Sequence, residues 1–376
     1  MSEVLLGKTL SELQEVALSV GLQKFAGKQL AEWLYVRRVT SFDEMTNISL
    51  KGREALKSNY VIGRHAPVRE AVSVDGTKKY LFEIFQRSGL SVNEENGLFS
   101  FSERRERSYI EAVYIPEEDR ATLCVSSQAG CKMGCRFCMT GTLGFHGNLS
   151  AADILNQIFE IDALAVSRRQ SALSNLVFMG EGEPMDNLDQ VLRTLEIMTA
   201  PYGCAWSPRR ITVSSVGVLP GLKRFLDESE CHLAISLHNP FATERAAIMP
   251  AEKMVHIADI VALLKQYDWT HQRRVSFEYI CWGGSSGSTP ENAIQRNDTP
   301  RHAQELLRLL KGLDCRINLI RFHEGVDRAF PASDEKQMVW LRDYLTEHGI
   351  TTTIRRSRGE DILAACGMLV NALQKD

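Results

Sequence analysis

The chain has 376 residues, a net charge of −3 and a pI near 6.3, so it is not a uniformly basic RNA-binding protein. Any contact with nucleic acid must therefore come from local patches. No apolar run approaches the roughly 18 residues of a membrane span, and the first ten residues do not resemble a signal peptide. The nine cysteines do not form the disulfide pattern of a small secreted protein, and the chain is therefore predicted to be cytoplasmic, without membrane contact.

Residues 1–60 are predicted to form a small helical domain. Thr9 and Glu12 match a capping box at the start of a first helix. A second helix is expected over residues 27–38, and a third from near Ser49. The domain carries a group of basic residues, namely Lys24, Lys28, Arg37, Arg38, Lys51, Arg53 and Lys57. This group fits either an ordinary solvated surface or a contact surface for RNA, and the sequence pattern leaves both interpretations open.

Residues 61–120 change character and predict a β-rich linker region. Residues 78–85 and 109–115 are rich in aromatic and β-branched side chains, which favour strands. The polar segment between them, residues 86–107, is expected to be a hairpin or a mobile loop.

From residue 121 to residue 376 short strands alternate with helical segments, which predicts a parallel sheet covered by helices. A core of about six such units is typical of a partial (β/α)6 barrel of the α/β class. The Gly- and Ser-rich segment 283–299 is expected to be a surface loop. The strands are expected at residues 123–126, 175–179, 211–214, 232–237, 275–281, 316–322 and 351–355, and the helices at 150–161, 188–198, 222–226, 257–264, 301–310 and 334–348.

Three cysteines, Cys131, Cys135 and Cys138, stand close together after the first barrel strand. Thiolates are ligands that iron–sulfur clusters and zinc select. A closed structural zinc site needs four ligands, usually in two separated pairs, and the chain has no second pair of this spacing. Three thiolates on a four-iron cluster leave one iron open to a small molecule. The alternative is that these cysteines are small buried hydrophobic residues.

A group of mostly polar residues lies in or directly after several of the predicted strands. The carboxyl ends of parallel strands meet at one edge of a sheet, where ligand sites form. Each residue by itself is typical of an ordinary loop or cap, but together they indicate one ligand-binding mouth. They are Gly182 and Glu183 in the turn 180–184, and Ser214, Ser236, Leu237, His238 and Asn318.

Six further cysteines lie outside the three-cysteine loop. From spacing alone Cys366 is expected to be buried and inert. Four others have no notable sequence setting and are interpreted as structural, namely Cys204, Cys231, Cys281 and Cys315. Cys124 lies shortly before the loop.

Taken together, these segments resemble the RlmN/Cfr family of radical S-adenosylmethionine (SAM) RNA methyltransferases, and more closely its RlmN branch. The resemblance runs through nearly the whole chain. Its segments are residues 9–25, 42–47, 110–116, 124–128, 131–138, 179–184, 236–238 and 358–367.

The resemblance implies a covalent mechanism on an adenine ring carbon, with C2 favoured, in 23S rRNA, and with tRNA as a further candidate substrate. One SAM methylates Cys366. A second SAM, held on a [4Fe–4S] cluster by Cys131, Cys135 and Cys138, yields a 5′-deoxyadenosyl radical that activates the methylated sulfur. Glu111 then removes the ring proton, and Cys124 attacks Cys366 to release the product. Gly182, Glu183, Ser214, Ser236, Leu237, His238 and Asn318 match the family's SAM contacts.

The family also implies a low-potential electron donor such as flavodoxin or ferredoxin, and a monomeric enzyme. Three features depart from its usual pattern, namely the long segment 86–107, the inserted segment 283–297 and Arg321 with His323 nearby. Three alternatives remain at this point: methylation of adenine C8, a radical SAM reaction on another substrate, and a non-catalytic RNA-binding protein with a structural metal.

Overall fold

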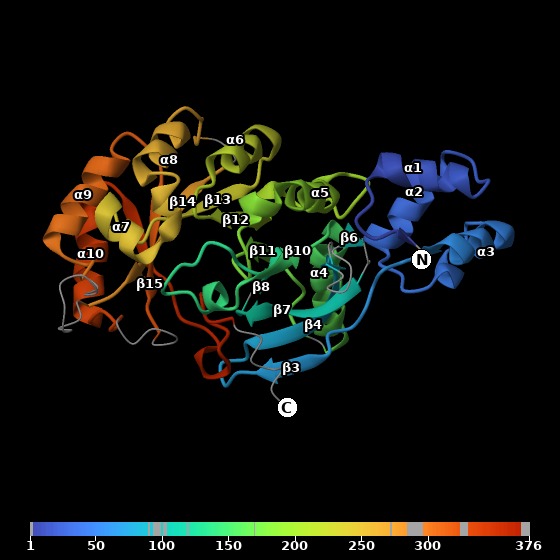
Figure 1. Ribbon diagram of the computed structural model, residues 1–376, viewed down its shortest axis with the longest axis horizontal. Coiled ribbons are helices and arrows are strands. Elements are labelled where there is room, and N and C mark those ends of the chain that lie inside the picture. Colours follow the sequence, from blue (N-terminus) through green and yellow to red (C-terminus); the bar gives the residue numbers. More distant parts are fainter. Residues whose placement is uncertain are drawn as a thin grey trace.

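The computed structural model describes residues 3–88, 91–92, 99–100, 104–118, 120–168, 170–270, 273–283, 296–323 and 330–369. A helical unit at the N-terminus lies beside a large curved sheet whose outer face is covered by helices (Figure 1). Among the described residues, no helix is long and apolar enough to cross a membrane.

The N-terminal unit comprises α1 (Leu10–Ser19), α2 (Ala26–Ala31) and α3 (Leu50–Asn59). The predicted capping box of Thr9 and Glu12 is present. The predicted second helix is wrong at its end, because α2 stops at Ala31 and the chain continues as a π-helical turn over Glu32–Val36. The unit is closed by β1 (Glu3–Val4), which pairs in parallel with β2 (Tyr60–Val61).

The N-terminal unit is tied to the rest of the protein by partly buried ion pairs with the helices that cover the sheet. Arg64 Nε lies 2.7 Å from Glu160 of α4 (Ala151–Ser167), and Arg193 of α5 (Leu188–Thr199) lies 2.6 Å from Glu12. Arg38 pairs with Asp162 of α4. These contacts fix the unit to one flank of the sheet.

One ten-stranded sheet runs in the order β16-β15-β14-β13-β12-β11-β8-β7-β4-β3. Seven neighbouring strands of this sheet are parallel, as the sequence predicts for a partial barrel. They are β8 (Ala121–Cys124), β11 (Asn175–Phe178), β12 (Ile211–Ser215), β13 (His232–Ser236), β14 (Val275–Cys281), β15 (Arg316–Arg321) and β16 (Thr351–Ile354).

The β-rich segment before residue 121 is continuous with this sheet. β7 (Arg104–Pro116) pairs antiparallel with β8, and then β4 (Lys78–Ser88) and β3 (Arg69–Val72) extend the edge. The predicted hairpin is confirmed as far as the pairing of Ser88 with Arg104. A further short pair joins β5 (Ser91–Val92) to β6 (Phe99–Ser100), and residues 89–90, 93–98 and 101–103 lie outside the described residues.

Helices cover the outer face of the parallel strands, where the main apolar core lies. Ser150 and Asp153 form a capping box at the start of α4. The predicted helices are present, and one further helix, α7, was not predicted because its polar run lacks apolar periodicity. The helices are α4 (Ala151–Ser167), α5 (Leu188–Thr199), α6 (Leu219–Glu228), α7 (Ala242–Ile248), α8 (Ile257–Leu264), α9 (Pro300–Leu310) and α10 (Glu335–Glu347).

The prediction of a surface loop over residues 283–299 is wrong at its C-terminal end. Asn297 and Asp298 are fully buried. The Asn297 side-chain amide donates to the carbonyl oxygens of His238 (2.8 Å) and Ile280 (2.7 Å), so it joins the ends of β13 and β14. Residues 284–295 lie outside the described residues.

Candidate active site

The three-cysteine loop lies between β9 (Gln128–Gly130) and β10 (Phe145–Asn148), which pair with each other and close the base of the loop. Backbone hydrogen bonds shape it, from Cys131 N to Gly144 O (2.9 Å) and from Cys138 N to Cys135 O (3.1 Å). The compact loop therefore presents its thiols to the mouth of the barrel.

Burial raises the pKa of all three thiols, and that of Cys131 to about 12. Repulsion from the charge of the neighbouring cysteines raises the pKa of Cys131 and Cys135 further. Cys135 is buried and Cys131 and Cys138 are partly buried, so as thiolates they would need a compensating positive charge, which the irons of a cluster would provide. Among the described residues, no three Cys, His, Asp or Glu side chains are placed to hold one metal ion. A four-iron cluster takes each thiolate on a different iron, so the donor set fits a cluster.

The turn after β11 approaches β9, the strand that leads into the cysteine loop, closely. Gly182 has a φ of +98°, and a Cβ on it would lie 2.5 Å from Cβ of Gln128. Glu183 is buried, and its carboxylate accepts hydrogen bonds from the backbone N–H groups of Met185 (3.0 Å) and Val216 (2.9 Å). Burial raises the Glu183 pKa to about 7. Glu183 thus joins the ends of β11 and β12 and brings a carboxyl group to the mouth.

Strand register gathers other predicted residues on the inner face of the sheet. Ser236, Glu278 and Asn318 are successive cross-strand partners, so their side chains lie on one face. Ser214 pairs with Ala234, two residues before Ser236, and lies on the same face. The side chains of these four residues therefore lie on the same face of the sheet.

Leu237 and His238 follow β13 directly. Leu237 is buried, and its backbone N–H donates to Glu278 O (3.0 Å). His238 adopts a φ of +55° and its ring lies edge-on to Phe137 of the cysteine loop, with the centroids 4.8 Å apart. Burial lowers the His238 pKa to about 3, and the backbone N–H of Ile280 donates to Nδ1 (3.1 Å). The imidazole is therefore neutral, with its proton on Nε2.

Two buried charged residues that the sequence interpretation missed organise this mouth. Arg245 of α7 pairs with Glu252 and donates to the carbonyl oxygens of Ser236 (2.8 Å) and Leu237 (3.0 Å). Glu278 accepts from Asn318 Nδ2 (2.8 Å) and lies 3.3 Å from Arg355. Neither residue belongs to a local motif, and only β-strand alternation around Glu278 could have indicated that it faces inward.

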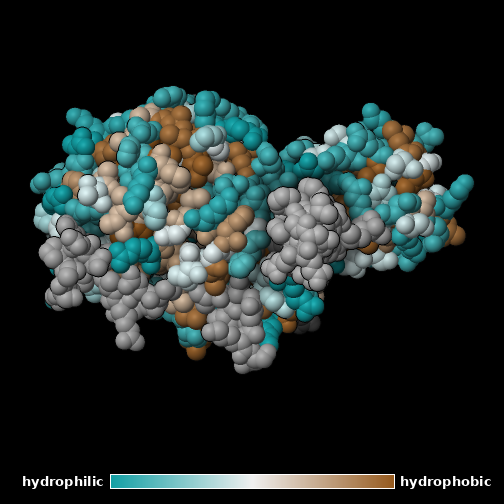
Figure 2. Space-filling model, viewed as in Figure 1, coloured by the Kyte–Doolittle hydropathy of each residue, from teal (hydrophilic) through white to brown (hydrophobic). Residues whose placement is uncertain are grey.

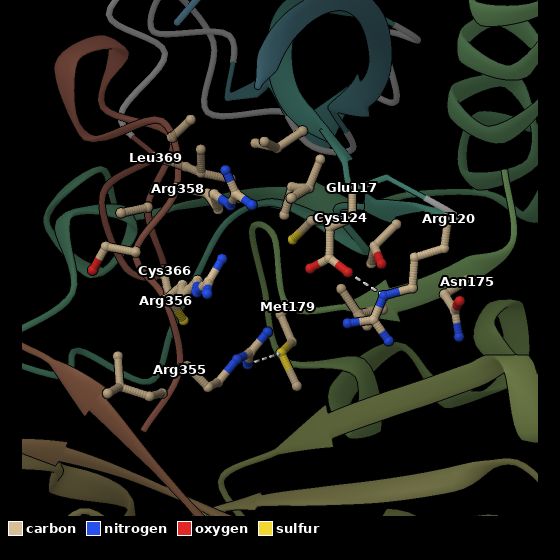
Figure 3. Close-up of a pocket in the computed structure, with 18 of the residues that line it drawn as sticks. Glu117, Arg120, Cys124, Asn175, Met179, Arg355, Arg356, Arg358, Cys366 and Leu369 are labelled. Carbon is tan, nitrogen blue, oxygen red and sulfur yellow. Dashed lines mark hydrogen bonds and ion pairs between the residues drawn. The ribbon is translucent and has the colours of Figure 1, made fainter. Parts of the chain in front are cut away.

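Cys124 and Cys366 line one cavity of about 880 Å³ inside the open barrel (Figure 3). Cys124 ends β8, and Cys366 comes from the segment after β16. The prediction from spacing alone, that Cys366 is buried and inert, is wrong about burial, because the residue is exposed to the cavity. The walls still displace most of the surrounding solvent, which raises the pKa of Cys124 to about 12 and that of Cys366 to about 11.

Arg355 lines the same cavity as both cysteines. Its Nη1 atom is 3.5 Å from the Met179 sulfur, and its positive charge opposes the rise in pKa of both thiols (Figure 3). A cation next to a thiol favours the thiolate, which is the nucleophilic form. Arg321, one of the residues that departs from the family pattern, supports this segment because it donates to Arg355 O (2.8 Å) and pairs with Glu335.

The segment that carries Cys366 is held from two sides. Thr140 Oγ1, just after the cysteine loop, donates to Leu369 O (2.9 Å), and Met139 N donates to Gly367 O (2.7 Å). On the other side, Asp75 in the turn between β3 and β4 accepts from Gly359 N (3.0 Å). Cys366 is thus placed between the cysteine loop and the β-rich edge of the sheet.

Glu111 of β7 is fully buried and forms an ion pair of 3.0 Å with Lys79 of β4. It lies on the same face of β7 as Val113, which lines the cavity. Lys79 also donates to Leu363 O (3.2 Å) in the Cys366 segment. The structure therefore connects Glu111 to the cavity wall and to the segment that carries Cys366.

We expect Gly182→Ala to destabilise the protein more than Gly312→Ala. Both positions have positive φ, which costs a non-glycine residue roughly 1 kcal/mol. A new Cβ at position 312 meets nothing within 4 Å, whereas at position 182 it meets Gln128, and overpacking adds about 1–3 kcal/mol. Chemical denaturation of both variants measures the difference. Equal free energies of unfolding would contradict the close approach.

Comparisons with known proteins agree with this geometry. Residues 4–62 match the model of the ribosomal RNA large subunit methyltransferase N-terminal domain. A probable dual-specificity RNA methyltransferase RlmN from Phocaeicola vulgatus is 53% identical, over 99% of this chain and 96% of the relative. A dual-specificity RNA methyltransferase RlmN from Syntrophobacter fumaroxidans is 38% identical over 96% of both chains.

A solved structure supports the same relationship. The crystal structure of a radical SAM methyltransferase from Sphaerobacter thermophilus superposes with a TM-score of 0.82 and 32% sequence identity, over 97% of this chain and 98% of that one. Similarity at these levels extends through the N-terminal unit, the barrel and the segment that carries Cys366. The chain therefore belongs to the RlmN family of RNA methyltransferases.

Proposed function

We propose that this protein is a radical SAM methyltransferase that adds a methyl group to C2 of an adenine in 23S rRNA and in tRNA through a methylated cysteine. The observation that carries the proposal is the meeting of Cys124 and Cys366 in one cavity. Most radical SAM reactions need no such carrier pair, which argues against a reaction on another substrate. The names of the relatives support RNA of two kinds, and membership in the RlmN family supports C2 over C8.

When bound, the cluster held by Cys131, Cys135 and Cys138 would supply the electron that cleaves SAM. Two SAM molecules are used per turnover: one would supply the methyl group, and the other the radical that abstracts a hydrogen atom. SAM is held at the mouth of the barrel by seven residues, namely Gly182, Glu183, Ser214, Ser236, Leu237, His238 and Asn318. A donor such as flavodoxin or ferredoxin delivers the electron, and the enzyme acts as a monomer.

Three residues of the chain carry the covalent chemistry. The Cys366 thiolate accepts the methyl group, and its sulfur later carries the carbon that bonds to the adenine. Glu111 accepts the ring proton. The Cys124 thiolate then attacks the Cys366 sulfur, which breaks the sulfur–carbon bond and leaves a disulfide for reduction. The released carbon takes up a proton to complete the methyl group, and the unpaired electron would pass back to the cluster. Arg355 favours both thiolates through its charge.

Nucleoside mass spectrometry tests the proposed product. A strain that lacks this protein is expected to lose 2-methyladenosine from both 23S rRNA and tRNA, and a plasmid copy of the wild-type chain is expected to restore it. A copy with Cys366→Ala serves as the matched inactive control. Loss of 8-methyladenosine instead, or no change in either RNA, would contradict the assignment.

The N-terminal unit is proposed to bind RNA through its unpaired lysines. Arg37, Arg38 and Lys57 already form ion pairs within the protein. Among the described residues, the exposed basic side chains of this unit without an ion pair are Lys24, Lys28 and Lys51. Phe25 is also exposed. Figure 2 shows hydrophobic areas among the hydrophilic surface of this unit. The contact surface is therefore smaller than the sequence suggested.

We expect a triple change of Lys24, Lys28 and Lys51 to Glu to weaken RNA binding, because each substitution removes a cation that can neutralise a phosphate. The slope of log K against log salt should become shallower by about 0.7–0.9 for each phosphate that is no longer neutralised. Filter binding at several salt concentrations measures it. Changing the ion-paired Lys57 to Ala is the control and should change binding little. Wild-type RNA affinity in the triple variant would refute this role of the unit.

A further inference from the structure

The cavity that contains the two cysteines is unusually basic for this chain. Its lining includes four arginines, Arg120, Arg355, Arg356 and Arg358, against two carboxylates, Glu117 and Glu118. The chain as a whole carries a net charge of −3. Figure 3 shows Arg356 and Arg358 on the wall beside Cys366, and Arg120 with Glu117 on the opposite wall. Of the four arginines, Arg355 alone is accounted for by the cysteine chemistry.

Arg356 is held in place by its neighbours while its own guanidinium group has no partner among the described residues. On one side Arg355 is anchored by Glu278, and on the other Ser357 lies 2.6 Å from His323. Arg356 itself is exposed, and no hydrogen bond or ion pair to its side chain is found in the described part of the chain. A guanidinium that is fixed at its backbone and free at its tip is preorganised to bind an anion.

Glu117 marks where such an anion would lie. Its carboxylate pairs with Arg120, three residues further along the same turn between β7 and β8. The charges of Arg120, Arg358 and Arg356 all contribute to lowering the Glu117 pKa, so three guanidinium groups act on one carboxylate. Arg358 has only a long contact of 3.9 Å with Asp75. Like a carboxylate, a phosphate is negatively charged and has oxygen atoms that can pair with a guanidinium group, and it has more oxygen atoms and more negative charge.

We propose that Arg120, Arg356 and Arg358 form a phosphate-binding site at the mouth of the cavity, and that Glu117 occupies this site until RNA displaces it. This rests on the proposed function. An adenine that reaches the cysteines must leave its base stack, which brings its ribose and flanking phosphates to the mouth. Ion pairs between arginine and phosphate then replace the pair of Arg120 with Glu117. The site selects a nucleotide that is part of a polynucleotide over free adenine.

Two variants with opposite expected effects test the site. Arg356→Ala should weaken binding of an unmodified tRNA transcript about tenfold and make the salt slope shallower by about 0.7–0.9, because one phosphate then remains without its arginine. Glu117→Gln should strengthen binding at low salt, because the competing charge is removed. Arg308→Ala is the control, since this exposed arginine on α9 pairs with Glu305 and should leave binding unchanged.

A second measurement separates RNA binding from the cysteine chemistry. Intact-protein mass spectrometry should find Cys366 methylated to the same extent in Arg356→Ala and wild type, because that step involves no RNA. A wild-type salt slope in Arg356→Ala, or no gain in affinity in Glu117→Gln, would overturn the phosphate site and leave the proposed function standing. Failure of the wild-type protein to bind any RNA would overturn both.

Discussion

Cys124→Ala protein purified from cells is expected to carry covalently bound RNA, whereas Cys366→Ala protein is expected to carry none. Without Cys366 there is no sulfur to carry the methyl carbon, so RNA stays unmodified. Without Cys124 the carbon–carbon bond forms, but no thiolate is left to attack the Cys366 sulfur. The protein should then remain attached to RNA through a thioether. The two cysteines line the same cavity, so the attack needs no large movement of the barrel.

Denaturing electrophoresis with and without ribonuclease measures the attached RNA. The double variant, Cys124→Ala with Cys366→Ala, should carry none, because the attachment requires Cys366. Cys281→Ala removes another buried cysteine outside the cavity and controls for loss of packing. Absence of RNA from Cys124→Ala, together with continued methylation by Cys366→Ala, would eliminate the carrier mechanism.

Cys135→Ala is expected to abolish both the cluster and the methylation of RNA. On the proposed cluster each of the three thiolates would hold a different iron, so the loss of one would leave a cluster with only two protein ligands. Iron analysis and the visible absorbance of anaerobically reconstituted protein measure cluster content. Nucleoside mass spectrometry measures methylation in parallel.

The control must separate ligation from packing, because Cys135 is also part of a small apolar cluster with Ile248, Met249 and Trp282. Met249 is fully buried there, so Met249→Ala is expected to cost about 2–5 kcal/mol of stability while iron binding persists. If Cys135→Ala retained a full complement of iron and methylated RNA, the ligand assignment would be wrong. A colourless wild-type protein that binds zinc would point to the structural-metal alternative.

Several features of this protein were predictable from sequence because they depend on short-range chemistry. The spacing of Cys131, Cys135 and Cys138 places three thiols in one loop whatever surrounds it. The capping boxes that begin with Thr9 and Ser150 form within one helical turn. Alternation of short apolar strands with helices predicts the parallel sheet, since each strand must bury both faces.

Errors arose where longer-range contacts override local preference. The polar segment of α7 forms a helix because the buried Arg245 pairs with Glu252 and holds the carbonyl groups after β13. Asn297 belongs to a Gly- and Ser-rich stretch, yet it is buried because its amide satisfies the backbone of two strand ends. The carbonyl groups that Asn297 contacts lie 59 and 17 residues away in the chain, so no local sequence pattern indicates them.

Local sequence defines which groups are available, namely the three thiols of the cysteine loop and the residues at the strand ends near it. Which of these groups meet depends on how the strands pair in the folded chain. Cys124 and Cys366 are far apart in the chain, and they share a cavity because β8 and the segment after β16 both face the interior of one curved sheet. The same register places Glu278 beside Asn318 and within reach of Arg355. Strand pairing fixes such distant neighbours through backbone hydrogen bonds, which carry no signature in the side chains they bring together.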